Sequence, residues 1–203
     1  MVPRLISVRG QRWSKLNEVL DKCREETSSD GADRHFLGSF EEIDRIMATA
    51  TYRPPSKSIP NETFSALNGF ILTSALYKAF GDIFSGNGAK RLHLISSVLA
   101  SICALFDGDR RDKRVGIVVV KKDEFRRALA HAYVSCEVLA DVDQIPVVHS
   151  IVTNFFEWVF SRSLNDKVER ATPVTIAMEN DAPAPKALQR IAEIMYAILA
   201  DDP

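Results

Sequence analysis

Hydrophobic residues recur every three or four positions along most of this chain, which is the spacing of an amphipathic helix. Near the N-terminus the pattern predicts a helix over 13–23, and the polar segment TSSDGADRH (27–35) predicts a loop after it. Ser39 and Glu42 have the spacing of a capping box, so a second helix is expected to begin there. The prolines of YRPPSKSIPN (52–61) cannot continue a helix, and this segment is therefore predicted to be a connector.

The middle of the chain carries the clearest helical patterns. Residues 62–84 become apolar nearly all round, as expected of a helix in the centre of a bundle. Residues 88–108 combine an apolar stripe with alanines and serines that would let a partner helix approach closely. The β-branched run VGIVVV (115–120) is predicted to be extended, as a short strand or as a lead-in to a helix over 123–140.

The C-terminal third is also predicted to be helical. A long helix is expected over 147–164 and an amphipathic helix over 186–200. The stretch between them, 165–185, is polar and contains prolines, and TIAMENDAPAP (175–185) is predicted to be a linker. The predicted fold class is therefore all-α, a multi-helix bundle with a smaller C-terminal helical subdomain. The break near Pro146 places the predicted boundary between an N-terminal helical domain, 1–141, and the C-terminal subdomain, 142–203.

Composition narrows the class of protein. The chain has 203 residues, of which 46% are hydrophobic and 26% charged, and these are ordinary values for a globular protein. A net charge of −1 means that any attraction to nucleic acid or membrane must come from local patches. Three widely spaced cysteines favour reduced thiols over a disulfide framework. We expect neither a signal peptide at the N-terminus nor a membrane-spanning segment.

Sequence patterns for catalysis and for metal binding are missing. The segment GDIFSGNGAK (81–90) lacks the spacing and the Ser/Thr of a phosphate-binding P-loop. Cys136 and His149 would supply two zinc ligands where a structural site needs four. No arrangement of nucleophile and base stands out. The sequence therefore predicts a protein that is not an enzyme, with no metal, no cofactor and no small-molecule substrate.

Basic residues gather at the start of the 88–108 helix and between 110 and 122. Such a patch could contact anionic lipid or phosphate groups, although an ordinary solvated face is an equally open interpretation. The candidate lipid- or phosphate-binding residues are Lys90, Arg91, Arg110, Arg111, Lys113, Arg114, Lys121 and Lys122.

Four parts of the chain follow one another in a familiar order. They are EEIDRIMATA with the turn YRPPSKS (41–58), FSALNGFILTSAL (64–76), GAKRLHLISSVLASICALFDG (88–108) and HAYVSCEVLADVDQ (131–144). Together they resemble the N-terminal helical domain of orthomyxovirus matrix proteins, the influenza-type matrix layer, over residues 40–144. The chain's size is similar to that of the shorter isavirus type found in fish. The family's strongly basic helix has no counterpart here, and its Cys/Cys/His/His pattern is incomplete, so no zinc site is carried over.

The resemblance implies a viral matrix protein that assembles into a layer under a lipid envelope. Its expected partners are further copies of itself in a lattice, the anionic membrane surface, and the viral ribonucleoprotein or its RNA. Its expected locations are the virion beneath the envelope, the host cytoplasm and inner membrane face, and the nucleus. Two alternatives stay open: a nucleocapsid-type RNA-binding protein, and a cytosolic helical adaptor or effector that binds a partner helix.

Overall fold

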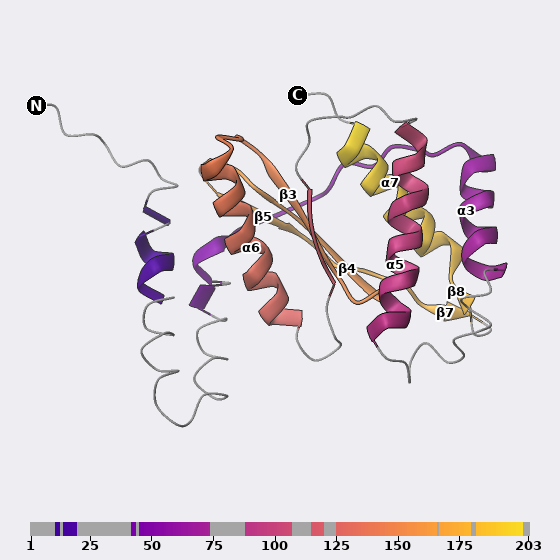
Figure 1. Ribbon diagram of the computed structural model, residues 1–203, viewed down its shortest axis with the longest axis horizontal. Coiled ribbons are helices and arrows are strands. Elements are labelled where there is room, and N and C mark those ends of the chain that lie inside the picture. Colours follow the sequence, from indigo (N-terminus) through magenta and orange to yellow (C-terminus); the bar gives the residue numbers. More distant parts are fainter. Residues whose placement is uncertain are drawn as a thin grey trace, which may run out of the picture.

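A β-sheet with helices on both faces forms the centre of this protein, as the computed structural model shows (Figure 1). The fold is therefore mixed α/β, and the predicted all-α bundle is wrong. The structure describes residues 11–12, 14–19, 42–43, 45–73, 88–106, 115–119, 125–165, 167–179 and 182–200.

The described residues form one sheet of six strands, in the order β1-β5-β4-β3-β2, with β6 paired to β4. Strand β4 runs antiparallel to both of its neighbours, β3 and β5, whereas β2 is parallel to β3 and β1 is parallel to β5. The strands are β1 (Ala48–Tyr52), β2 (Val115–Val119), β3 (Val148–Thr153), β4 (Glu157–Ser163), β5 (Val168–Ala171) and β6 (Val174–Thr175). Two further short strands, β7 (Met178–Glu179) and β8 (Ala182–Pro183), pair with each other.

One face of the sheet is covered by α6 (Phe125–Val142), which connects the parallel strands β2 and β3. The buried side of α6 contributes Leu129 and Tyr133, which pack with Val152 of β3 and Val159 of β4. The same layer contains helical residues from the N-terminal part of the chain, at 11–12, 14–19, 42–43 and 45–47. Their buried side chains are Leu16, Val19, Ile43 and Met47.

Among the described residues, α5 (Gly88–Cys103) and α7 (Pro185–Ala200) lie on the other face, and α3 (Asn61–Thr73) packs against both of them. A single 3₁₀ turn, η1 (Ala104–Phe106), follows α5. The core on this side is built around Trp158 and Phe160 of β4 and Ile151 of β3, all 2% exposed or less. Apolar residues of α5 and α7 pack onto these side chains, and this is the larger of the two cores.

The hairpin β3–β4 replaces the helix predicted over 147–164. Successive strand residues point to opposite faces, so Ile151 and Phe160 lie in one core while Val152 and Val159 lie in the other. Because helices cover both faces, most positions in the two strands are buried, and their central apolar residues stand in consecutive runs, 151–152 and 158–160, instead of alternating with polar ones. A two-sided strand therefore lacks the polar alternation that would distinguish it from a buried helix.

Several other predictions are confirmed. The run at 115–119 is the strand β2. The helices at 88–103, 125–142 and 185–200 occupy most of the spans predicted over 88–108, 123–140 and 186–200. The predicted linker over 175–185 is wrong, because the paired strands β7 and β8 lie within it. Strands β5 and β6 occupy part of the polar stretch before it.

Elsewhere the helical predictions are met in part. The helix predicted over 41–50 gives way to a strand at Ala48, and α3 accounts for 61–73 of the helix predicted over 62–84, whose remainder lies outside the described residues. The loop predicted over 27–35 also lies outside them. The predicted domain boundary at 141/142 falls within α6, and strands from both sides of it share the sheet.

Candidate functional site

The C-terminal end of β4 carries polar clusters on both faces of the sheet. Arg162 and Ser163 are adjacent on the strand, so their side chains point to opposite faces. Ser163 lies on the α6 side and Arg162 on the side of α5 and α7. The two faces therefore have different chemistry at the same place in the sheet.

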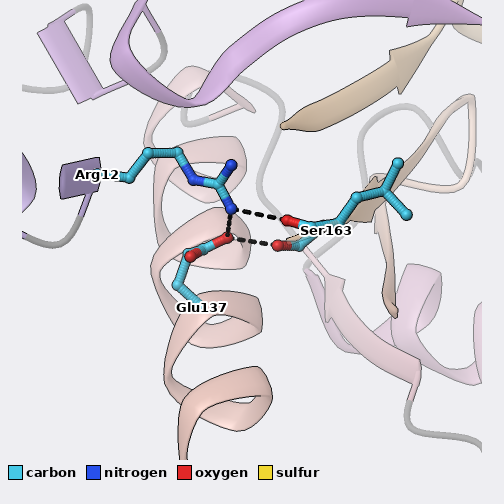
Figure 2. A network of polar contacts seen from close by, with 4 residues as sticks. Arg12, Glu137 and Ser163 are labelled. Carbon is cyan, nitrogen blue, oxygen red and sulfur yellow. Dashed lines mark hydrogen bonds and ion pairs between the residues drawn. The ribbon is translucent and has the colours of Figure 1, made fainter. Parts of the chain in front are cut away.

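On the α6 side, an ion pair is buried between Arg12 and Glu137 (Figure 2). The Nη2 atom of Arg12 lies 3.0 Å from Oε1 of Glu137, and their side chains are 8% and 1% exposed. The same Nη2 donates a hydrogen bond to the backbone oxygen of Leu164 at 2.7 Å. The hydroxyl of Ser163 donates to Oε1 of Glu137. The network thus joins residue 12 to α6 and to the end of β4.

We interpret this buried network as a structural contact between distant parts of the chain. The Nε and Nη1 atoms of Arg12 are buried and have no hydrogen-bond partner among the residues that the structure describes. Burying a charge that is only partly satisfied is costly, and removing either partner costs more because it leaves the other buried and unpaired. The arrangement is suited to holding the N-terminal helical residues in one position, and it offers no exposed group to a ligand.

On the opposite face, a histidine and two charged residues form a row across three strands. His149, Arg162 and Glu169 are successive cross-strand partners on β3, β4 and β5. The Nε of Arg162 donates to Oε2 of Glu169 at 2.6 Å, and Nζ of Lys167 lies 2.6 Å from Oε1 of the same carboxylate. Both oxygens of Glu169 are therefore engaged by cations.

These contacts keep Glu169 ionised. The hydrogen bond from Lys167 lowers the pKa of Glu169 most, and Arg162 lowers it further through its own hydrogen bond and its charge, against the opposing effect of burial. With two cations around one carboxylate, Arg162, Lys167 and Glu169 carry a net positive charge.

Tyr52, at the end of β1, completes this group of residues. The guanidinium of Arg162 lies over the Tyr52 ring, 4.7 Å from its centroid. Burial raises the pKa of Tyr52 to about 12, which Arg162 opposes and Glu169 reinforces. The Tyr52 hydroxyl is itself buried and has no hydrogen-bond partner among the described residues.

We define the Arg162 cluster as Tyr52, His149, Arg162, Lys167 and Glu169, and take it as the candidate functional site. The side chains of Arg162 and Lys167 are 35% and 41% exposed, so the cluster is open to solvent on one side. Within the described parts of the chain, no group of three or more His, Cys, Asp or Glu residues could hold a metal ion. The arrangement is suited to recognising a charged group.

The basic residues singled out by sequence lie elsewhere. Arg91 is 9% exposed, and its guanidinium lies 5.8 Å from the centroid of the Phe156 ring. Lys90 is in the first turn of α5, but its side chain is outside what the structure describes. The other six also lie outside the described residues: Arg110, Arg111, Lys113, Arg114, Lys121 and Lys122. The binding role of these eight residues stays a prediction.

The sequence did not reveal the Arg162 cluster, because its members fell within a predicted helix, a polar stretch and a predicted connector. One local signal was present. Asn165 and Asp166 are adjacent, and both residue types are common in turns. In the structure the backbone N–H of Leu164 donates to the oxygen of Lys167 at 2.8 Å, which closes the turn between β4 and β5. Reading this turn would have placed Arg162 and Glu169 opposite each other.

Fold and site together define an α/β protein with a partly exposed charged cluster at one end of its sheet. A comparison with curated proteins finds Crinkler effector protein 5 of Phytophthora infestans, which is 39% identical to this chain over 220 residues. The match covers 95% of the chain, and the chain spans 62% of that relative's length. No family model and no solved structure matches the chain.

This similarity corrects the sequence-based identification. Nearly the whole chain aligns with an oomycete effector, so the resemblance to orthomyxovirus matrix proteins is wrong, and with it the predicted structural role under a viral envelope. The predicted partners are corrected for the same reason: a lattice of copies, an anionic membrane, and a viral ribonucleoprotein or its RNA. The predicted virion location is wrong as well. No helix among the described residues is long and apolar enough to cross a membrane.

Proposed function

We propose that this chain is an effector module that acts inside a host cell by binding a host molecule. The observation that carries the proposal is the 39% identity with Crinkler effector protein 5 over 95% of the chain. Among the alternatives that the sequence left open, the similarity favours the effector over the RNA-binding protein. That alternative assumed a purely helical protein, whereas the observed fold is mixed α/β.

The geometry of the Arg162 cluster favours binding over catalysis. Both oxygens of Glu169 are engaged by Lys167 and Arg162, so the carboxylate is poorly placed to accept a proton from a substrate. The pKa of Tyr52, at about 12, keeps its hydroxyl protonated at neutral pH and opposes a role as general base. Rigid, partly exposed cations on a sheet are typical of a surface that recognises an anionic partner.

The proposal is tested by producing the chain directly in the cytosol of cells of a host of Phytophthora infestans. The chain is produced with a fluorescent tag, and cells that produce the tag alone are the negative control. We expect a host response to the chain, measured as cell viability and as changed transcript levels, that the tag alone does not cause. Trp158→Asp is the matched folding control, because it places a charge in the larger core and should abolish the response. If cells with the wild-type chain are indistinguishable from cells with the tag, the chain does not act as an effector.

A further inference from the structure

Arg162 is held in place by contacts that leave its outer nitrogens available. Its Nε donates a hydrogen bond to Glu169, and its guanidinium lies over the Tyr52 ring. Among the residues that the structure describes, neither Nη group has a hydrogen-bond partner, and the side chain is 35% exposed. A guanidinium fixed through Nε and through its flat face presents both Nη groups in the geometry that recognises two oxygens of one anion.

Lys167 strengthens this arrangement. Its ammonium group lies 2.6 Å from the other oxygen of Glu169, and its side chain is 41% exposed. Glu169 thus holds two cations side by side at the surface without neutralising both of them. Because Glu169 already orders the side chains of Arg162 and Lys167, these side chains would lose little further entropy when a ligand binds.

We propose that the Arg162 cluster is a binding site for a phosphate monoester, with Arg162 as the bidentate donor and Lys167 as the second cation. A monoester carries close to two negative charges at neutral pH, so the net positive charge of the cluster attracts it more strongly than a carboxylate.

The same observations disfavour a nucleic acid strand. Binding a strand needs a track of cations and open aromatic faces for the bases. In the cluster, the face of the Tyr52 ring is taken by Arg162, and the chain as a whole has a net charge of −1. A single phosphate group is therefore the ligand that fits.

The test is a titration of the full chain followed by nitrogen NMR of the Arg162 Nε–H group. This proton is hydrogen-bonded to Glu169, which favours its detection. The probes are inorganic phosphate, a phosphoserine tripeptide and a short single-stranded RNA. We expect inorganic phosphate and the phosphoserine tripeptide to shift the signal with a dissociation constant of roughly 1 mM. A tighter constant for the tripeptide would indicate a phosphorylated protein as the source, and equal constants a small phosphate ester.

The variants are Arg162→Gln, Arg162→Lys and Arg190→Gln, with binding followed by calorimetry and folding by circular dichroism. Arg162→Gln should weaken binding about tenfold or more, and Arg162→Lys should lose less because it keeps the charge but not the planar fork. Arg190 is an exposed residue of α7 outside the cluster, so Arg190→Gln makes the same charge change and should bind as the wild type does.

Three results would overturn the proposal. The first is no shift of the Arg162 signal at phosphate concentrations about ten times the expected dissociation constant. The second is equal weakening by Arg162→Gln and Arg190→Gln, which would reflect overall charge alone. The third is Arg162-dependent binding of the RNA that is tighter than the binding of inorganic phosphate and of the tripeptide, which would make the ligand a phosphodiester. This inference rests on the proposed function only for its biological meaning, since binding is measured without a host cell and can fail or succeed independently.

Discussion

At the scale of single residues, two glutamates of this protein show how partners decide the behaviour of a carboxylate. Glu137 is 1% exposed and faces one arginine and one serine inside the α6 layer. Glu169 is held by two cations at the rim of the sheet. The first is a structural contact whose loss affects folding, and the second orders a surface that can meet a ligand. Each role makes a separate prediction.

Removing one partner of the buried pair should destabilise the fold strongly. Arg12→Met or Glu137→Leu alone should lower the free energy of unfolding by about 3 kcal/mol, because each leaves an uncompensated buried charge. The double variant replaces both charges by apolar side chains of similar size and should lose much less than the sum. Urea denaturation of the four proteins measures the coupling. Strict additivity of the two single effects would show that the pair does not act as a unit.

The lowered pKa of Glu169 makes a prediction about acid stability. The unfolded chain, with a pKa near the ordinary value of 4.5, takes up this proton at a higher pH than the folded protein does. The carboxylate therefore contributes stability above pH 4.5, and this contribution is lost as the pH falls through the lower, folded-state pKa. In urea titrations, the wild type should be more stable than Glu169→Gln near neutral pH, and the difference should shrink in acid. A pH-independent difference would contradict this assignment.

The burial of the Tyr52 hydroxyl predicts that the fold tolerates its removal. Because this hydroxyl has no hydrogen-bond partner among the described residues, Tyr52→Phe removes an unsatisfied polar atom and keeps the ring beneath Arg162. The free energy of unfolding should stay the same or rise by up to about 1 kcal/mol. Tyr52→Leu, which removes the ring, should be less stable than Tyr52→Phe. Thermal unfolding of the three proteins decides, and a clear loss in Tyr52→Phe would mean that the hydroxyl is satisfied.

At the scale of elements, the turn between β3 and β4 shows how side chains force a backbone conformation. Phe155 is fully buried and has a φ of 78°, a region that a bulky residue rarely adopts. The hydroxyl of Thr153 accepts a hydrogen bond from the Phe155 N–H at 3.0 Å, and the indole N–H of Trp158 donates to the Phe155 oxygen at 2.7 Å. These contacts and the burial of the ring hold the strained residue in place.

Asn154 is the residue of this turn whose substitution is most informative. Its side-chain oxygen accepts hydrogen bonds from the backbone N–H groups of Phe156 and Glu157, at 3.0 and 2.8 Å. Asn154→Ala leaves both donors without this acceptor and should cost about 2 kcal/mol of stability in chemical denaturation. Asn154→Asp keeps an acceptor oxygen and is the matched control, expected to stay close to the wild type. Equal losses in the two variants would show that the amide acts through contacts other than these.

At the scale of the whole molecule, the sheet joins parts of the chain that are far apart in sequence. Strand β1, at residues 48–52, pairs with β5, at residues 168–171, and the parallel pair β2 and β3 is connected through α6. The helices on the two faces pack on side chains of the same strands, since β3 and β4 contribute to both cores. Exposing either core therefore requires the shared strands to come apart, and we expect the described body to unfold cooperatively.

Cooperative unfolding can be followed through the reactivity of Cys136. Its side chain lies 2% exposed between α6 and β3, and burial raises its pKa to about 11, which a hydrogen bond with Ser150 opposes and Glu137 reinforces. Both effects keep the thiol from reacting in the folded state. Alkylation followed by mass spectrometry should modify the exposed Cys103 quickly, and Cys136 only in proportion to global unfolding by urea. Rapid labelling of Cys136 in the native protein would show local opening of α6.

The sequence by itself determined the elements whose pattern is one-sided or punctuated. The helices α6 and α7 have one apolar face and one polar face, so their period shows directly in the chain. The β-branched run at β2 favoured an extended conformation without reference to its neighbours. These are local properties, set by side-chain sterics and by the contrast between a buried and a solvated face.

Tertiary structure alone decided the rest. The 147–164 segment becomes a hairpin because helices cover both sides of it, and a strand buried on both faces has no polar alternation to distinguish it from a buried helix. The Arg162 cluster also depends on register, since His149, Arg162 and Glu169 meet only when three strands are aligned. Tyr52 reaches Arg162 from more than one hundred residues away in the chain, through the pairing of β1 with β5. Contacts between distant segments are fixed by packing energy, which periodicity along the chain does not contain.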